Sequence, residues 1–169
     1  LNKINVDGFK IASGEVTNHP LIKKISSYKK NIYLSSGMST YKEIDAAIKI
    51  LKSKNLTLMQ CTSEYPCPVN KIGLNVFKKF KKYNCVLGLS DHTKGHTTVL
   101  GAIAMGARVI EKHVTLNRAT KGTDHAFSLE FAGLKKTIDY LTNAKMAFGS
   151  NSKYQMREEK EKLKKQVKS

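Results

Sequence analysis

The apolar residues of this chain fall into short runs that alternate with longer segments of periodic pattern. The short runs, rich in β-branched and aliphatic residues, predict five strands, and apolar positions spaced three or four residues apart predict a helix after each strand. We expect strands at residues 8–12, 32–35, 56–62, 86–90 and 108–114, and helices at 21–28, 41–51, 74–83, 97–105 and 131–148. The strands recur about every 25 residues, which is typical of βα units in a parallel sheet.

The position of the polar residues distinguishes between the two architectures that contain such units. Every predicted strand ends in polar or reactive side chains, as expected for a barrel, whereas an open doubly wound sheet concentrates its site at one switch point. The nucleotide-binding motifs GxGxxG and GxxxxGK[ST] are absent. We therefore expect an α/β fold in which residues 1–150 form five βα units of an incomplete (β/α)₈ TIM barrel. Residues 151–169, including the charged stretch 155–168, are expected to connect to a further domain that is missing here.

Composition narrows the functional classes. The 169 residues carry 30 Lys and Arg against 13 Asp and Glu, a net charge of +17 that is compatible with nucleic-acid binding. Six pairs of adjacent lysines are spread over predicted helix surfaces, with few aromatic residues or arginines between them, so we expect a solvated surface and no nucleic-acid partner. No apolar run approaches the roughly 18 residues of a membrane span, and no cysteines form a CxxC pair. We expect a cytoplasmic protein without a membrane partner, in which Cys61 packs in a strand with no base beside it.

Two histidines, His92 and His113, end consecutive predicted strands. Because side chains alternate along a strand, both imidazoles are expected on one face, with Asp91 and Lys112 on the other. The alternation also argues against a catalytic triad of Ser90, Asp91 and His92. Neutral imidazole is a common ligand of divalent transition metals. The residues alone leave two interpretations open, which are hydrogen-bonded strand histidines and a paired metal-binding or catalytic site.

One lysine and four serines end the neighbouring strands: Lys10, Ser13, Ser35, Ser63 and Ser90. Ammonium and hydroxyl groups around a single mouth suit the oxygens of a phosphate group. Each serine taken singly is also explained by ordinary turn chemistry. The set as a whole indicates an anion site.

Six ordered segments resemble consecutive strand-end motifs of the sialic acid synthase (N-acetylneuraminate synthase) family, which includes legionaminic and pseudaminic acid synthases. They are KIASGE (10–15), YLSSGM (33–38), QCTSEYP (60–66), GLSDHT (88–93), IEKHVTL (110–116) and KGTDHAFSLE (121–130). The resemblance implies the C-terminal part of a TIM barrel that condenses phosphoenolpyruvate with N-acetylmannosamine or a related mannosamine-type sugar. The products would be a nine-carbon 2-keto sugar acid and phosphate. A legionaminic or pseudaminic acid synthase with a different sugar is the alternative within the family.

The resemblance also implies roles for individual residues. It assigns a divalent metal, usually Mn²⁺, to His92 and His113. It assigns phosphoenolpyruvate binding to Lys10, Ser13, Ser35 and Ser90. Tyr65 and Asp124 match positions near the N-acetylated amino sugar, and Glu15 and Lys10 match catalytic positions. Ser63 is a further phosphate-binding candidate, although some family members carry Asn there. The full-length protein is expected to be a homodimer whose first three strands and C-terminal antifreeze-like domain have no counterpart in this chain. Two alternatives of other classes are an inactive fragment and a basic module that binds phosphate without catalysis.

Overall fold

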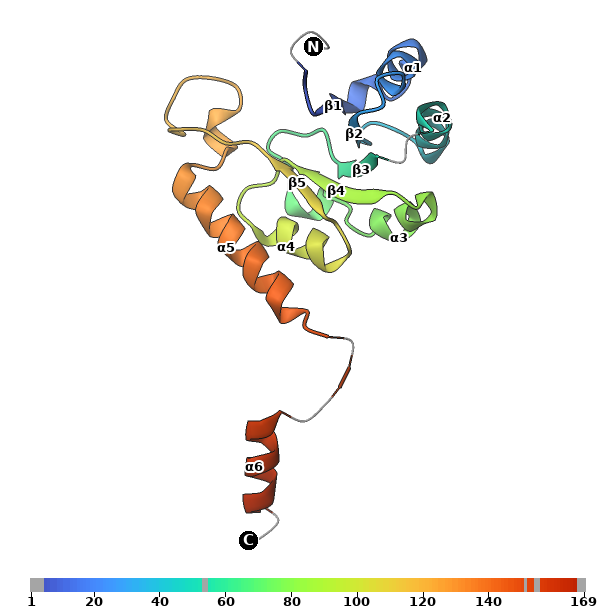
Figure 1. Ribbon diagram of the computed structural model, residues 1–169. Coiled ribbons are helices and arrows are strands. Elements are labelled where there is room, and N and C mark those ends of the chain that lie inside the picture. Colours follow the sequence, from blue (N-terminus) through green and yellow to red (C-terminus); the bar gives the residue numbers. More distant parts are fainter. Residues whose placement is uncertain (1–4, 53–54, 151, 154–155, 167–169) are drawn as a thin grey trace.

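Five parallel strands form a single sheet in the computed structural model, which describes residues 5–52, 55–150, 152–153 and 156–166. The strands are β1 (Gly8–Ile11), β2 (Asn31–Ser35), β3 (Leu56–Cys61), β4 (Val86–Asp91) and β5 (Val109–Lys112). Their order in the sheet follows the chain, β1-β2-β3-β4-β5 (Figure 1). A doubly wound sheet reverses its strand order at a switch point, and this sheet does not. The expectation of a partial barrel is confirmed.

A helix follows each strand, close to the predicted positions: α1 (His19–Ser26), α2 (Tyr41–Leu51), α3 (Val76–Phe80), α4 (Thr97–Ala104) and α5 (Phe131–Ala147). Helix α2 begins where expected because Thr40 and Glu43 form a capping box. Helix α1 begins two residues before the predicted position because the Asn18 side chain accepts the Leu21 amide and caps the first turn. The predicted helix at 74–83 is divided, since α3 passes into a short 3₁₀ helix, η4 (Lys81–Tyr83).

The hydrophobic core lies between the sheet and the helices. Alternate strand residues on this side are buried and apolar: Phe9, Ile11, Ile32, Leu34, Leu56, Leu58, Leu87 and Leu89. They pack against apolar helix residues such as Ile22, Ala47 and Phe77. The opposite side of the sheet, here called the inner face, carries the residues between them. The rung Cys61, Ser90 and Glu111 is an example, since these residues are paired in register across three strands.

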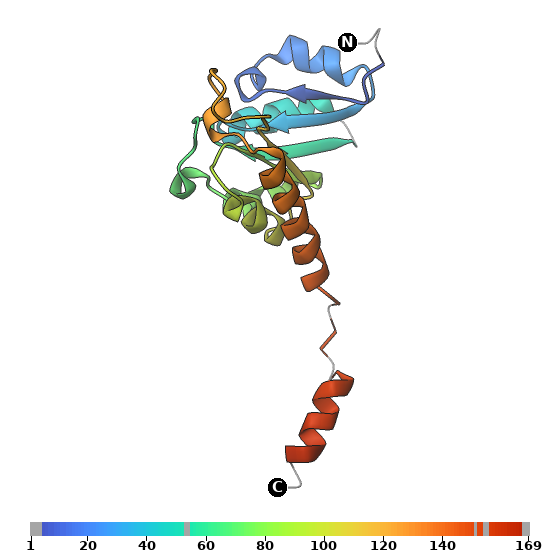
Figure 2. The same cartoon turned by 90° about the vertical axis from the view of Figure 1, so that its left-hand side faces the viewer.

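The chain continues after α5 into α6 (Arg157–Gln166), which buries no residue and lies apart from the sheet and its helices (Figures 1 and 2). The charged stretch expected at 155–168 is helical at Arg157–Gln166, and residues 155, 167 and 168 lie outside the described residues. None of the helices in the described part of the chain is both long and apolar enough to cross a membrane.

Candidate functional site

A cavity of about 440 Å³ lies at the carboxyl ends of the strands on the inner face. Its volume is within the range of small-molecule sites. Residues from five consecutive strand ends line it: Lys10, Ser13, Ser35, Met38, Cys61, Ser63, Tyr65, Ser90, His92 and Glu111. The structure thus brings together the lysine and all four serines that sequence analysis placed around an anion. The carboxyl ends of parallel strands meet at one end of a barrel, which explains this convergence.

An ion pair closes one side of the cavity and joins the first strand to the last. The Lys10 Nζ lies 2.5 Å from both carboxylate oxygens of Glu111, and Ser90 Oγ donates to Glu111 Oε1 at 2.7 Å. In a flat sheet β1 and β5 would be about 19 Å apart, too far for these side chains to meet, so the contact requires a strongly curved sheet. Burial alone raises the pKa of the Glu111 carboxyl, but the hydrogen bonds from Lys10 and Ser90 outweigh it and hold this pKa below its usual value. Glu111 lies two residues before His113, so strand alternation puts it on this face, but only the structure identifies its partner.

The hydroxyl of Ser35 is buried in the cavity wall. Ser35, the last residue of β2, is 2% exposed, and within the described residues no group bonds its Oγ. Nearby, the Gly37 amide donates to Ser13 Oγ at 3.1 Å. A Cβ at Gly37 would come within 2.5 Å of Ser63 Oγ and 2.7 Å of Ser13 Oγ, so only glycine lets these hydroxyls converge. An unpaired buried hydroxyl is costly, which indicates that a ligand completes this cluster.

The two imidazoles lie on the same side of the sheet, as strand alternation predicts. Their ring centroids are 5.4 Å apart, and the Tyr65 ring lies 4.1 Å from the His92 centroid and 6.0 Å from the His113 centroid. The His92 Nδ1 is 2.9 Å from the Thr62 carbonyl oxygen. Since a carbonyl only accepts, this contact places the proton on Nδ1 and leaves Nε2 unprotonated, with a lone pair that can accept a hydrogen bond or bind a metal. The second nitrogen of a metal-binding histidine is usually held in this way.

These histidines fit a divalent metal with two protein ligands. A centroid separation of 5.4 Å is within the reach of two imidazoles that share one ion through bonds of about 2.1 Å. Across the described part of the chain, no group of three or more His, Cys, Asp or Glu side chains is arranged to hold a metal. An ion bound by the pair would therefore keep positions open for water or substrate oxygens.

The environment of Cys61 differs from the expectation. Burial raises the pKa of its thiol, but hydrogen bonds with His92 and Ser13 more than offset burial and lower this pKa to about 7. For His92 the directions are reversed. Burial lowers the pKa of its imidazole, but its hydrogen bonds with Cys61 and the Thr62 carbonyl outweigh burial and raise this pKa above the usual value. The prediction that no base lies beside Cys61 is wrong, because the neighbouring strand brings His92 to it.

The remaining predicted site residues lie around the cavity. Asp124 Oδ2 is 3.7 Å from His113 Nδ1, so this sugar-site candidate lies beside the histidine pair. Glu15 does not line the cavity, and its carboxylate accepts a hydrogen bond from Asn18 Nδ2 at 2.6 Å. Sequence analysis did not identify Phe127, whose buried ring is 5.2 Å from the His113 centroid. Nothing in the local pattern distinguishes this phenylalanine from a core residue.

The chain is similar in sequence to a known protein family and to proteins within it. A model of the NeuB family matches residues 1–153. The chain is 42% identical over 159 residues to N,N'-diacetyllegionaminic acid synthase of Campylobacter jejuni, which covers 90% of this chain and 48% of that protein. It is 33% identical over 157 residues to N-acetylneuraminate-9-phosphate synthase of Homo sapiens, covering 90% and 44%. The chain thus spans about half the length of the curated relatives it matches.

A solved structure supports the same fold. The N-acetylneuraminic acid synthetase of Leptospira borgpetersenii, crystallised with citrate, superposes with a TM-score of 0.88 at 30% identity. The match covers 99% of this chain and 60% of that one. The five βα units therefore correspond to part of a sialic acid synthase structure.

Proposed function

The chain belongs to the NeuB family, and on that premise we propose that it supplies the phosphate-binding and metal-binding part of a phosphoenolpyruvate-dependent synthase site. The reaction is the condensation of phosphoenolpyruvate with an N-acetylated mannosamine-type sugar. C3 of phosphoenolpyruvate forms a carbon–carbon bond to the aldehyde carbon of the open-chain sugar. Water adds at C2, and phosphate leaves by cleavage of the C2–O bond, so the oxygen of the added water becomes the C2 carbonyl oxygen of a nine-carbon 2-keto sugar acid.

The observation that carries this proposal is the unpartnered Ser35 hydroxyl beside a lysine. Ser35 Oγ is buried without a partner among the described residues, and Lys10 lines the same cavity. A phosphate or carboxylate oxygen would accept hydrogen bonds from both groups. Ser13 and Ser63, which converge at Gly37, supply two further hydroxyls for such an anion. Charge-assisted hydrogen bonds of this kind are the strong ones.

Glu111 is a second anionic partner for the lysine of the anion site. Its carboxylate lies 2.5 Å from the Lys10 ammonium, so a bound phosphate would compete with Glu111 for the same cation. Ser90 donates to Glu111 and is also within the cavity, so it can turn to the ligand. The cation is thereby kept in the cavity rather than extended into solvent.

The histidine pair adjoins the cavity through His92, which lines it. His92 and His113 would hold the metal, with Tyr65 packed against both rings. A divalent ion, Mn²⁺ in this proposal, would act there as a Lewis acid toward the sugar's aldehyde oxygen. Asp124, 3.7 Å from His113, would accept a hydrogen bond from a sugar hydroxyl.

A diacetylated sugar of the legionaminic type is the second candidate substrate. Its support is the identity of 42% with the N,N'-diacetyllegionaminic acid synthase of Campylobacter jejuni; the corresponding synthase of Legionella pneumophila and the human N-acetylneuraminate-9-phosphate synthase are both 33% identical. Both candidates use the same phosphoenolpyruvate chemistry, so the residues of the anion site have the same roles in each.

The experiment is a phosphate-release assay with the complete gene product. Phosphoenolpyruvate is supplied with N-acetylmannosamine or with the corresponding diacetamido sugar, with Mn²⁺ or after chelation. We expect release that depends on both sugar and metal, and its loss in His92→Ala and in His113→Ala. His19→Ala is the matched control, because His19 is exposed on α1 and should leave the rate unchanged.

The result also separates the alternatives. Absence of sugar-dependent release with either sugar would refute the synthase assignment. If the protein instead binds polyphosphate with equal affinity before and after the two histidine substitutions, it is a basic phosphate-binding module.

A further inference from the structure

A buried ion pair lies directly behind the two histidines, on the helix-facing side of the sheet. Asp91 and Lys112 precede His92 and His113 in the chain and are paired in register between β4 and β5. The Lys112 Nζ is 2.7 Å from Asp91 Oδ2, and the two side chains are 7% and 0% exposed. Asp91 and Lys112 thus face each other on neighbouring strands, each one residue before a histidine of the pair.

This pair departs from the composition of the face on which it lies. The other helix-facing residues at the paired positions of β4 and β5 are Leu87, Leu89 and Ile110. Removing two charges from water is costly, and a well-packed apolar pair often stabilises a protein as well or better. Stability alone therefore does not explain why the charges occur at this rung.

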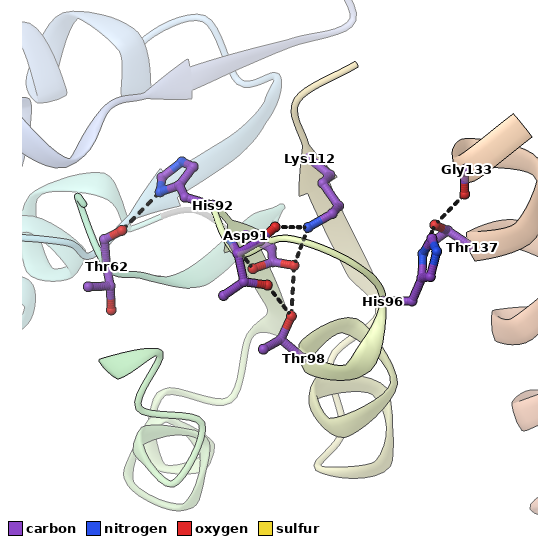
Figure 3. A network of polar contacts seen from close by, with 9 residues as sticks. Thr62, Asp91, His92, His96, Thr98, Lys112, Gly133 and Thr137 are labelled. Atoms are coloured by element: carbon purple, nitrogen blue, oxygen red, sulfur yellow. Dashed lines mark hydrogen bonds and ion pairs between the residues drawn. The ribbon is translucent and has the colours of Figure 1, made fainter. Parts of the chain in front are cut away.

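The hydrogen bonds of the pair fix the backbone beside His92. Asp91 Oδ1 accepts the Thr93 amide at 2.9 Å, and Lys112 donates to the Thr93 carbonyl at 2.6 Å. Thr98 Oγ1, from α4, donates to Asp91 Oδ2 at 2.8 Å. Figure 3 shows Lys112 and Thr98 converging on Asp91 while the His92 ring turns toward Thr62. Both backbone polar groups of Thr93, the residue after His92, are thus hydrogen-bonded to the ion pair.

The same cluster connects the two histidine-bearing strands. Lys112 is the last residue of β5 and immediately precedes His113, so its ammonium links the end of β5 to Asp91 and Thr93 in β4 and its following loop. The ladder between the strands ends at this rung, since no pairing between β4 and β5 is present beyond Asp91 and Lys112 among the described residues. Past this point, side-chain bonds hold the two chain segments in register.

We propose that the Asp91–Lys112 pair is a positioning device that sets the separation and orientation of His92 and His113 for joint binding of one metal ion. This inference rests on the metal-binding role proposed above. Asp91 and Lys112 do not contact the metal or substrate, because they lie on the opposite face of the sheet. They act through the backbone that carries the two imidazoles.

The test is the double variant Asp91→Leu/Lys112→Met in the complete gene product. It replaces the pair by apolar side chains and leaves no unpaired buried charge, so the fold is expected to persist. Mn²⁺ affinity is measured by electron paramagnetic resonance, which detects the free ion. We expect affinity to fall roughly 10- to 100-fold, as for residues that orient metal ligands, with an unfolding midpoint close to that of the wild type.

Two controls isolate the effect. Asp45→Leu/Lys82→Met removes an ion pair of the same residue types, exposed and joining α2 to η4, and should leave Mn²⁺ affinity unchanged. Lys112→Arg preserves the charge pair and should retain most of the affinity. Should the first double variant fail to fold, Thr98→Val removes one hydrogen bond to Asp91 without altering a charge, and Mn²⁺ affinity should fall roughly threefold.

The outcomes distinguish this inference from the proposed function. Wild-type Mn²⁺ affinity in Asp91→Leu/Lys112→Met would overturn the positioning role and leave the synthase proposal intact. If the wild type binds no Mn²⁺, the proposed metal site is refuted, and nitrogen-15 NMR of the metal-free histidine rings decides the inference. We expect His92 to carry its proton on Nδ1 in the wild type and to lose this single tautomer in the double variant. Identical ring spectra would overturn the positioning role.

Discussion

Replacing Ser35 by alanine should stabilise the ligand-free protein and weaken anion binding. The Ser35 hydroxyl is 2% exposed and lacks a hydrogen-bond partner within the described residues, so it contributes no bond to the folded state. In the unfolded chain the same hydroxyl bonds to water. Folding therefore desolvates it without compensation, and this cost is avoided in Ser35→Ala.

The magnitudes follow from the two states of this hydroxyl. A buried polar group without a partner costs about 1–3 kcal/mol, and we expect Ser35→Ala to raise the free energy of unfolding by about 1 kcal/mol. A neutral hydrogen bond to a bound anion contributes about 0.5–1.5 kcal/mol, so the dissociation constant for phosphoenolpyruvate should increase roughly three- to tenfold. The substitution thus acts in opposite directions on stability and on binding.

Ser36→Ala is the matched control in the next position of the chain. The Ser36 hydroxyl is also buried, at 6% exposure, but it donates to the Met59 carbonyl at 2.8 Å. Its removal should lower the free energy of unfolding by about 1 kcal/mol and leave anion affinity unchanged. Urea unfolding of the ligand-free proteins and calorimetric titration with phosphoenolpyruvate measure the two quantities.

Two results would refute this reasoning. If Ser35→Ala destabilises the ligand-free protein as much as Ser36→Ala does, the Ser35 hydroxyl has a partner in the folded state. If Ser35→Ala binds phosphoenolpyruvate as tightly as the wild type, this hydroxyl does not belong to the anion site.

Three further predictions concern charged groups. Lys10→Met should weaken phosphoenolpyruvate binding roughly tenfold in calorimetric titration, at the low end for a charge-assisted bond because Lys10 is partly exposed; unchanged affinity would contradict its role. Asp91→Asn leaves Lys112 buried without its counter-charge and should lower the free energy of unfolding, measured in urea, by about 3 kcal/mol. Asp45→Asn, in an exposed ion pair, should lower it by less than about 1 kcal/mol, and equal losses in the two variants would contradict the reasoning. Because the folded-state pKa of Glu111 lies below its usual value of 4.5, its contribution to stability is present above pH 4.5 and is lost as the pH falls through the lowered folded pKa. Glu111→Gln should therefore flatten the fall in the free energy of unfolding at acid pH, and an unchanged fall would contradict the assignment.

Much of the fold could be predicted because it depends on local pattern. Apolar runs and helical periodicity identified all five strands and the helix after each, and the boundaries shifted where capping or a change of helix type intervened. Helix α1 begins earlier because Asn18 caps it, and α3 ends early because the chain tightens into η4. The alternation of side chains also placed His92 and His113 together, since it depends only on strand geometry.

Contacts between distant strands were decided by the tertiary structure. The chain by itself determined the order of the βα units, the polar strand ends and the face on which each side chain lies, because these follow from neighbouring residues. Curvature of the sheet brings Lys10 of β1 to Glu111 of β5, and strand register places His92 beside Cys61. Burial then leaves the Ser35 hydroxyl without a hydrogen-bond partner among the residues that the structure describes. These properties depend on the distances between segments far apart in the chain, which local pattern does not specify.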